Sequence, residues 1–170
     1  MSILQHAIIN KGGIMFNILE VFEIAEQIER NGYNFYMKAA SISSEPSAKE
    51  FLENLAEMEN DHERLFANMR NKYCEKDTDL SMDLDDTAVN YINAFVNGEV
   101  FLNLKPLNEV IMGRETLEEI KKLAIEFEKN TVVYFTTLKN ALKDSADKDK
   151  VEELINEELR HISILVDWKI

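Results

Sequence analysis

The chain has 170 residues, of which 45% are hydrophobic and 30% are charged, and its net charge at pH 7 is −13. This length and composition indicate one globular domain that is large enough to bury a hydrophobic core. The acidic charge argues against binding to nucleic acid or to anionic membranes, because both interactions require a basic surface. The single cysteine, Cys74, excludes an internal disulfide and a four-cysteine metal site, and we expect a cytoplasmic protein.

Residues 1–14 are interpreted as an N-terminal extension without an assigned function, and residues 15–170 as one helical domain. The apolar runs are too short for a transmembrane helix, which needs about 18 consecutive apolar residues. The chain holds only 5 glycines and 2 prolines, and this scarcity favours long, uninterrupted helices.

The spacing of the apolar residues predicts four long helices, at residues 18–41, 46–73, 116–142 and 147–168. Short polar breaks separate the first two helices and the last two, so each pair is expected to form an antiparallel hairpin. The long crossover at 75–115 contains a predicted short helix at 85–98, and it would leave the second and third long helices parallel. The expected fold is therefore all-α, a four-helix bundle of two antiparallel hairpins joined by this crossover. Two separate hairpin domains are the alternative, but each would leave an apolar stripe exposed.

Two of the three histidines follow a glutamate by three residues, in the pairs Glu59–His62 and Glu158–His161. Both pairs lie on the apolar stripe of a predicted helix, among residues that should face the core. Burying a carboxylate there is costly unless another group compensates its charge. The pairs therefore indicate a buried polar site rather than ordinary core packing.

The two halves of the chain repeat each other at an offset of 99 residues, which pairs Glu29 with Glu128 and Glu59 with Glu158. In each half, about 13 residues lead from the first glutamate to the turn and about 13 lead back, at 1.5 Å per helical residue. The two carboxylates of a hairpin therefore return to the same level. Four carboxylates and two imidazoles are expected to meet in one layer of the bundle.

Two divalent cations would balance four buried carboxylates and complete their coordination. Glutamate oxygens with one imidazole per metal are typical ligands of iron or manganese, whereas structural zinc sites are usually rich in thiolates. Zinc could still bind to the same ligands. The sequence therefore predicts a dinuclear metal site with six ligands: Glu29, Glu59, His62, Glu128, Glu158 and His161. A helical bundle with Glu–His pairs on its surface is the alternative.

The ligand in the first helix is assigned to Glu29, because it lies on the apolar stripe and has the symmetric partner Glu128. Glu26, one turn earlier, is interpreted as a residue that supports the ligands or is exposed. Tyr36 lies two turns after Glu29. It is predicted either to hydrogen-bond a ligand carboxylate or to pack in the core.

The segments IERNGYNFYMKAA and FLENLAEMENDH, with the recurring IEFEKNTVVYF and LINEELRH, resemble the rubrerythrin and ferritin-like family of diiron-carboxylate proteins. The resemblance extends over residues 16–168 and implies a ferritin-like four-helix bundle. It implies two irons per chain, the first held by Glu29, Glu59 and His62 and the second by Glu128, Glu158 and His161. Glu59 and Glu158 are the implied bridging carboxylates.

The same resemblance implies a homodimeric oxidoreductase that reduces hydrogen peroxide or dioxygen in oxidative-stress defence. A ferroxidase, a metal-stabilised helical module without turnover and a substrate hydroxylase or oxidase are the alternatives. Two features differ from rubrerythrins that have a rubredoxin domain. The four cysteines of that domain are missing from this sequence, so we expect a separate electron donor such as a rubredoxin-like protein. Thr131 stands one turn after Glu128, where those proteins have a further glutamate, so the ligand exchange that uses this glutamate is not carried over.

Overall fold

The computed structural model describes residues 8–10, 13–15, 17–74, 82, 84, 86–96 and 110–170. Its elements are β1 (Ile8–Asn10), β2 (Gly13–Met15), α1 (Ile18–Ile42), α2 (Pro46–Cys74), α3 (Asp86–Val96), α5 (Leu117–Ala141) and α6 (Ser145–Asp167). The two short strands pair antiparallel in the region interpreted as an N-terminal extension, for which the sequence predicted no element. None of the helices in the described part of the chain has the length and apolar character to cross a membrane.

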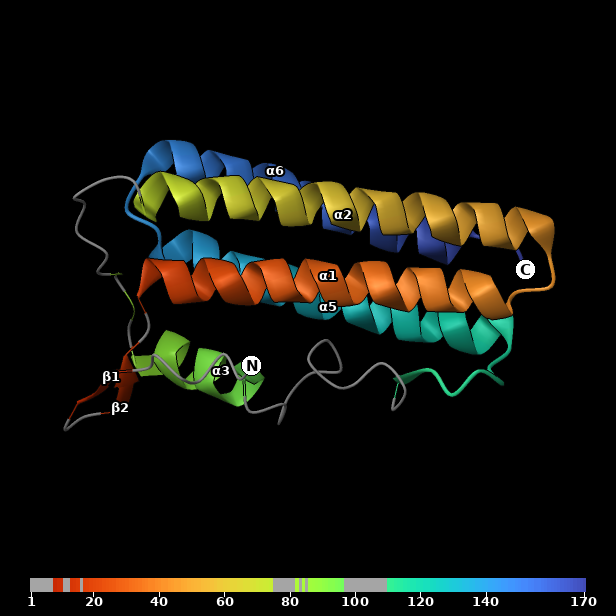
Figure 1. The fold of residues 1–170 in the computed structure, drawn as a ribbon, viewed down its shortest axis with the longest axis horizontal. Coiled ribbons are helices and arrows are strands. Elements are labelled where there is room, and N and C mark those ends of the chain that lie inside the picture. The colour runs from red at the N-terminus through yellow and green to blue at the C-terminus, as the bar shows by residue number, and fades with distance from the viewer. Residues whose placement is uncertain are drawn as a thin grey trace.

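The four long helices lie side by side as a bundle, in which α1 pairs with α2 and α5 pairs with α6 (Figure 1). Helices α2 and α5 run in the same direction, as a long crossover requires (Figure 1). The all-α four-helix bundle of two hairpins is thus confirmed, and the predicted ends of the long helices differ from the observed ends by two residues or fewer. Helix α3 lies within the predicted segment 85–98, and much of the remaining crossover lies outside the described residues.

The first helix of each hairpin begins at a capping box, and the two boxes are 99 residues apart like the predicted ligands. The Asn17 side chain accepts hydrogen bonds from the first-turn backbone of α1, and Glu20 accepts one from the backbone of Asn17. Thr116 and Glu119 repeat this arrangement at α5. Each box satisfies backbone N–H groups that would otherwise have no partner and sets where its helix begins.

The core consists of two hydrophobic clusters, and along the helices the six predicted ligands lie between them. Representative members are Phe22, Phe66 and Phe135 in one cluster and Phe35, Leu52 and Leu165 in the other. All six of these side chains are completely buried. Apolar packing therefore closes the bundle on both sides of the polar layer.

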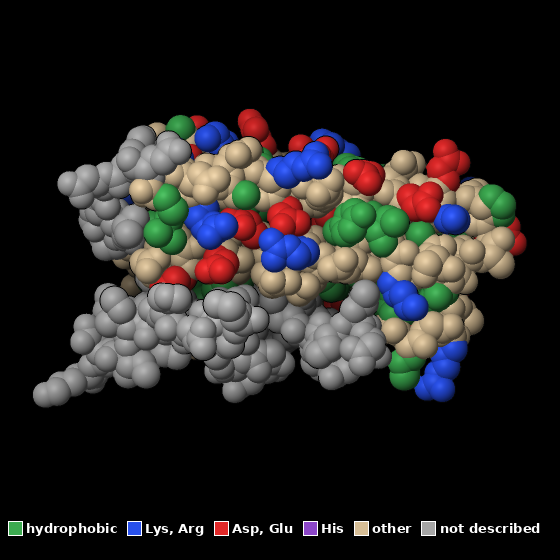
Figure 2. Space-filling model, viewed as in Figure 1, with side chains coloured by type: hydrophobic (Ala, Val, Ile, Leu, Met, Phe, Trp, Pro, Cys, Tyr) green, Lys and Arg blue, Asp and Glu red, His purple; other side chains and the backbone are tan. Residues whose placement is uncertain are grey.

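The outer face of α1 and α2 carries acidic and basic side chains close together (Figure 2). Ion pairs join the two helices there, including Arg30 with Glu63 at 2.5 Å and Arg70 with Glu26 at 2.6 Å. These contacts add to the apolar packing that joins α1 to α2.

Candidate metal centre

The structure brings all six predicted ligands into one layer, and each is buried with 4% or less of its surface exposed. All four long helices contribute to the layer. Helices α1 and α5 each supply one glutamate, and α2 and α6 each supply a glutamate and a histidine one turn later. This is the layer that the internal repeat predicted.

The six side chains form two overlapping groups, and the potential ligand atoms of each group lie within 4.8 Å of one another. The first group is Glu29, Glu59, His62 and Glu158, and the second is Glu59, Glu128, Glu158 and His161. Glu59 and Glu158 belong to both groups. They lie where carboxylates that bridge two metal ions would have to lie.

The same ring nitrogen of each histidine faces the carboxylates. His62 Nδ1 lies 3.2 Å from Glu29 Oε2 and 2.8 Å from Glu158 Oε1. His161 Nδ1 lies 2.9 Å from Glu158 Oε2 and 3.4 Å from Glu59 Oε1. The two imidazole rings are stacked, with their centroids 5.6 Å apart. Glu158 thus directs one carboxylate oxygen toward each histidine.

Several buried atoms of this layer make no hydrogen bond of normal geometry to the described residues, although some of them lie close to one another. They are Oε1 of Glu29, Oε1 of Glu59, both carboxylate oxygens of Glu158 and both ring nitrogens of His161. Buried polar atoms are paired in nearly all native structures, so a cluster of unpaired ones requires a further partner. Two divalent cations between these ligands would provide it, and the donor set of carboxylate oxygens and imidazoles fits iron or manganese.

Burial makes ionisation of these glutamates unfavourable. Loss of hydration, reinforced by neighbouring carboxylates, raises the pKa of Glu59 to about 7 and that of Glu128 to about 8. Burial would also raise the pKa of Glu158, but its contacts with both histidines bring it below the usual value. Burial opposes protonation of His62, yet its carboxylate neighbours raise its pKa to about 12. Without metal, the layer therefore retains protons that a bound cation would displace.

Glu26 and Glu29 have different partners in the structure. Both oxygens of Glu26 accept hydrogen bonds from Arg70, at 2.6 Å and 3.0 Å, and Glu26 belongs to neither metal-binding group. Glu29 faces the layer as predicted. Glu26 instead joins α1 to α2 through a bidentate ion pair.

Tyr36 adopts the first of its two predicted roles and also packs in the core. Its side chain is completely buried, and its hydroxyl donates a hydrogen bond to Oε1 of Glu128. The bond crosses from one hairpin to the other. Sequence reasoning expected a ligand carboxylate but could not identify which one.

Gly32 lies one turn after Glu29 and leaves space for a ligand from the neighbouring helix. A Cβ atom at this position would lie 2.7 Å from Oε2 of Glu59, which is closer than real Cβ atoms approach other atoms. The equivalent residue in the second half is Thr131, which is buried and donates its hydroxyl to the carbonyl of Phe127. The glycine therefore sets the position of one shared carboxylate.

Sequence reasoning missed Glu157. Its Oε2 lies 2.9 Å from Nε2 of His62, on the side of the ring that faces away from the layer. The Glu157 side chain is 41% exposed, so it joins the buried histidine to the solvent. Its position directly before the predicted ligand Glu158 was the only available signal, and adjacent glutamates are common on exposed helix faces.

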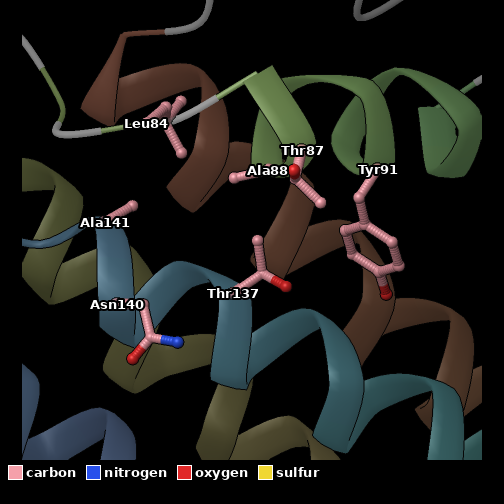
Figure 3. A pocket seen from close by; sticks show the side chains of 7 residues that line it. All are labelled: Leu84, Thr87, Ala88, Tyr91, Thr137, Asn140 and Ala141. Atoms are coloured by element: carbon pink, nitrogen blue, oxygen red, sulfur yellow. The ribbon is translucent and has the colours of Figure 1, made fainter.

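A cavity of about 510 Å³ lies between α3 and the C-terminal part of α5, where Tyr91, Thr137 and Asn140 are among its lining residues (Figure 3). None of the six predicted ligands lines it. The cavity is therefore separate from the polar layer, and we assign it no function.

The protein-family model named Rubrerythrin matches residues 13–70, which contain the predicted ligands of α1 and α2. The whole fold is similar to a crystal structure of a Thermotoga maritima protein described as a ferritin-like diiron-carboxylate protein. The TM-score is 0.66 at 19% sequence identity, and the match covers 90% of this chain and 94% of that chain. The comparison with curated proteins gives no significant match. The fold is therefore ferritin-like, as the motifs implied.

Proposed function

We propose that this chain, rubrerythrin-like in its first hairpin and ferritin-like in fold, is a non-haem diiron oxidoreductase that reduces hydrogen peroxide or dioxygen. The main support is the buried layer, in which two overlapping groups of potential ligands contain oxygen and nitrogen atoms that make no hydrogen bond of normal geometry. Two bound ferrous ions would supply the two electrons that, with two protons, reduce hydrogen peroxide to two waters or dioxygen to hydrogen peroxide.

Each of the two ions would be held by its own residues and by residues that both ions share. Glu29 with His62 and Glu128 with His161 would each serve one ion, and the two shared glutamates would lie between them. Four carboxylates carry the charge that two divalent cations neutralise. The apolar clusters on both sides of the layer would limit the access of water to the reacting centre.

We propose that the electrons come from a separate protein, such as a rubredoxin-like donor. The only cysteine of the chain, Cys74, is exposed at the C-terminal end of α2. One thiol cannot form the four-cysteine iron site of a rubredoxin domain. The donor would have to reduce the centre through the surface of the bundle.

Ferroxidase activity is the second candidate, and Thr131 favours it. This residue stands one turn after Glu128, and its hydroxyl is used in a hydrogen bond to the backbone of its own helix. No carboxylate is therefore available there for exchange with His161 or His62. A six-ligand site of this kind could oxidise Fe²⁺ as its substrate rather than reduce peroxide.

The test begins with the metal content of anaerobically purified protein. Stopped-flow absorbance of the reduced, iron-loaded protein then follows its reoxidation by hydrogen peroxide and, separately, by dioxygen. We expect two irons per chain and faster reoxidation by peroxide. Faster reoxidation by dioxygen with continued turnover of added Fe²⁺ would favour the ferroxidase instead.

Two variants and a control complete the design. Glu59→Ala and Glu158→Ala should lose bound iron, because each removes a carboxylate shared by both groups. Glu153→Gln removes an exposed charge from the same helix as Glu158 and should leave the iron content unchanged. Iron that is retained without reaction with either oxidant would indicate a structural metal. Failure of the wild-type protein to bind metal would refute the proposal.

A further inference from the structure

We propose that the two metal positions are unequal. Site A, formed by Glu29 and His62 with the shared glutamates, binds a divalent cation first and more tightly. Site B, formed by Glu128 and His161 with the same shared glutamates, binds second and more weakly. The inference rests on the proposed dinuclear centre but concerns residues outside the ligand set.

The internal repeat makes the two sites directly comparable. At the offset of 99 residues, every ligand of site A has the same residue type as its equivalent in site B. Ligand identity therefore gives neither site an advantage. Any difference in affinity must come from the residues that contact the ligands.

The first difference concerns Nε2 of the two histidines. Oε2 of Glu157 lies 2.9 Å from Nε2 of His62, whereas Nε2 of His161 has no hydrogen-bond partner among the described residues. The residue equivalent to Glu157 in the first half is Met58, which has no carboxylate. Among the described residues, His62 but not His161 has an acceptor at Nε2, which orients the ring and holds the proton of the neutral imidazole there, so that a cation can displace the proton on Nδ1.

Such an acceptor strengthens metal binding in a known way. It orients the imidazole, selects the tautomer and makes the ligating nitrogen more basic. Losing a partner of this kind typically lowers metal affinity about 10- to 100-fold. Glu157 also adds a negative charge near site A, although water weakens this effect because the side chain is 41% exposed.

The second difference concerns the partners of Glu29 and Glu128, the two glutamates that belong to one group only. Tyr36 donates its hydroxyl to Oε1 of Glu128, a ligand of site B. The residue equivalent to Tyr36 is Phe135, which lacks a hydroxyl and packs against Phe66 with ring centroids 4.7 Å apart. This hydrogen bond orients Glu128 and so supports site B. Glu157 supplies a negative charge as well as orientation, whereas the neutral Tyr36 supplies orientation alone, so the balance still favours site A.

The test is an anaerobic titration of the metal-free protein with Co²⁺ at one fixed pH. Calorimetry measures the affinities, and visible absorption reports the coordination of the ion. We expect two steps whose affinities differ at least about 10-fold. His62→Ala should abolish the tight step, and His161→Ala should abolish the weak one.

Three further variants test the named residues. Glu157→Met places on α6 the residue that stands at the equivalent position of α2, which removes the acceptor of His62, and it should weaken the tight step about 10-fold or more. Met58→Glu supplies the missing carboxylate on α2 and should strengthen the weak step. Tyr36→Phe removes the hydrogen bond to Glu128 and should weaken the weak step further. Glu153→Gln, an exposed α6 glutamate outside the layer, is the control and should change neither step.

The outcomes distinguish a failure of this inference from a failure of the proposed dinuclear centre. Two equal steps in the wild-type protein would overturn the inequality and leave a dinuclear site in place. An unchanged tight step in Glu157→Met, or loss of the tight step in His161→Ala, would overturn the assignment of site A. Absence of Co²⁺ binding in the wild-type protein would overturn the proposed centre itself.

Discussion

Replacing Gly32 with alanine should have opposite effects on the protein with and without metal. The new Cβ would lie 2.7 Å from Oε2 of Glu59, whereas ordinary contacts begin at 3.4 Å, so the carboxylate must withdraw by about 0.7 Å. Cδ and Cγ of Glu59 would lie 3.1 and 3.2 Å from the new Cβ and must also yield slightly, but without metal the side chain is free to rotate. Alanine is also more favourable than glycine inside a helix by about 0.5–1 kcal/mol. The metal-free variant should therefore be as stable as the wild-type protein or slightly more stable.

The metal-loaded protein should respond differently, because Glu59 is shared by both ligand groups. Metal–ligand distances tolerate deviations of only about 0.2 Å, which is less than the required movement. We expect Gly32→Ala to weaken binding of both ions, by about 10-fold or more. Urea unfolding of the metal-free protein and calorimetric titration with Co²⁺ measure the two effects.

Asn34→Ala is a suitable control for this substitution. Asn34 lies on the exposed face of α1, so alanine there should raise helix stability by a few tenths of a kcal/mol without contact with Glu59. Metal affinity should stay at the wild-type value. Unchanged Co²⁺ affinity in Gly32→Ala would refute the reasoning, as would a loss of more than about 1 kcal/mol in the metal-free variant.

Three other predictions follow from the described contacts. Arg70→Ala leaves the buried Glu26 without its bidentate partner and should reduce the free energy of unfolding by about 2–3 kcal/mol, measured with urea, while metal content is unchanged. The pKa values of about 7 for Glu59 and about 8 for Glu128 mean that the folded metal-free protein holds more protons than the unfolded chain above pH 4.5. Its stability should therefore fall as the pH rises from 5 to 8, whereas affinity for Co²⁺ should rise because binding displaces these protons. Asp147→Ala removes a fully buried carboxylate that joins α6 to the C-terminal end of α2, and it should cost about 2–3 kcal/mol in urea unfolding.

A control variant or an opposite result would contradict each of these three predictions. Arg64→Ala breaks an ion pair with Asp61 in which both side chains are at least 70% exposed, so it should change stability by less than about 0.5 kcal/mol. A loss as large as that of Arg70→Ala would show that burial does not decide the effect. Metal-free stability that rises between pH 5 and 8 would contradict the raised pKa values. Wild-type stability in Asp147→Ala would show that its contacts with α2 are not important.

Much of the fold followed from local spacing. The apolar periodicity identified the four long helices because each must bury one stripe, and the short breaks implied hairpins. The ligand layer was equally accessible, because equal distances from Glu29 and Glu59 to their turn place both carboxylates at one level in any antiparallel hairpin. The exact repeat in the second half then made chance a poor explanation.

The contacts around the ligands were decided only by the tertiary structure. Spacing along a helix gives the level and approximate face of a side chain, but its partner atom depends on how neighbouring helices are rotated and offset. Packing therefore directed Glu26 to Arg70, Tyr36 to Glu128 and Glu157 to His62. The sequence alone indicated the helices and the two equivalent sets of predicted ligands. The packing of those helices decided which ligands are supported from outside, and it thereby made two halves with identical ligands unequal.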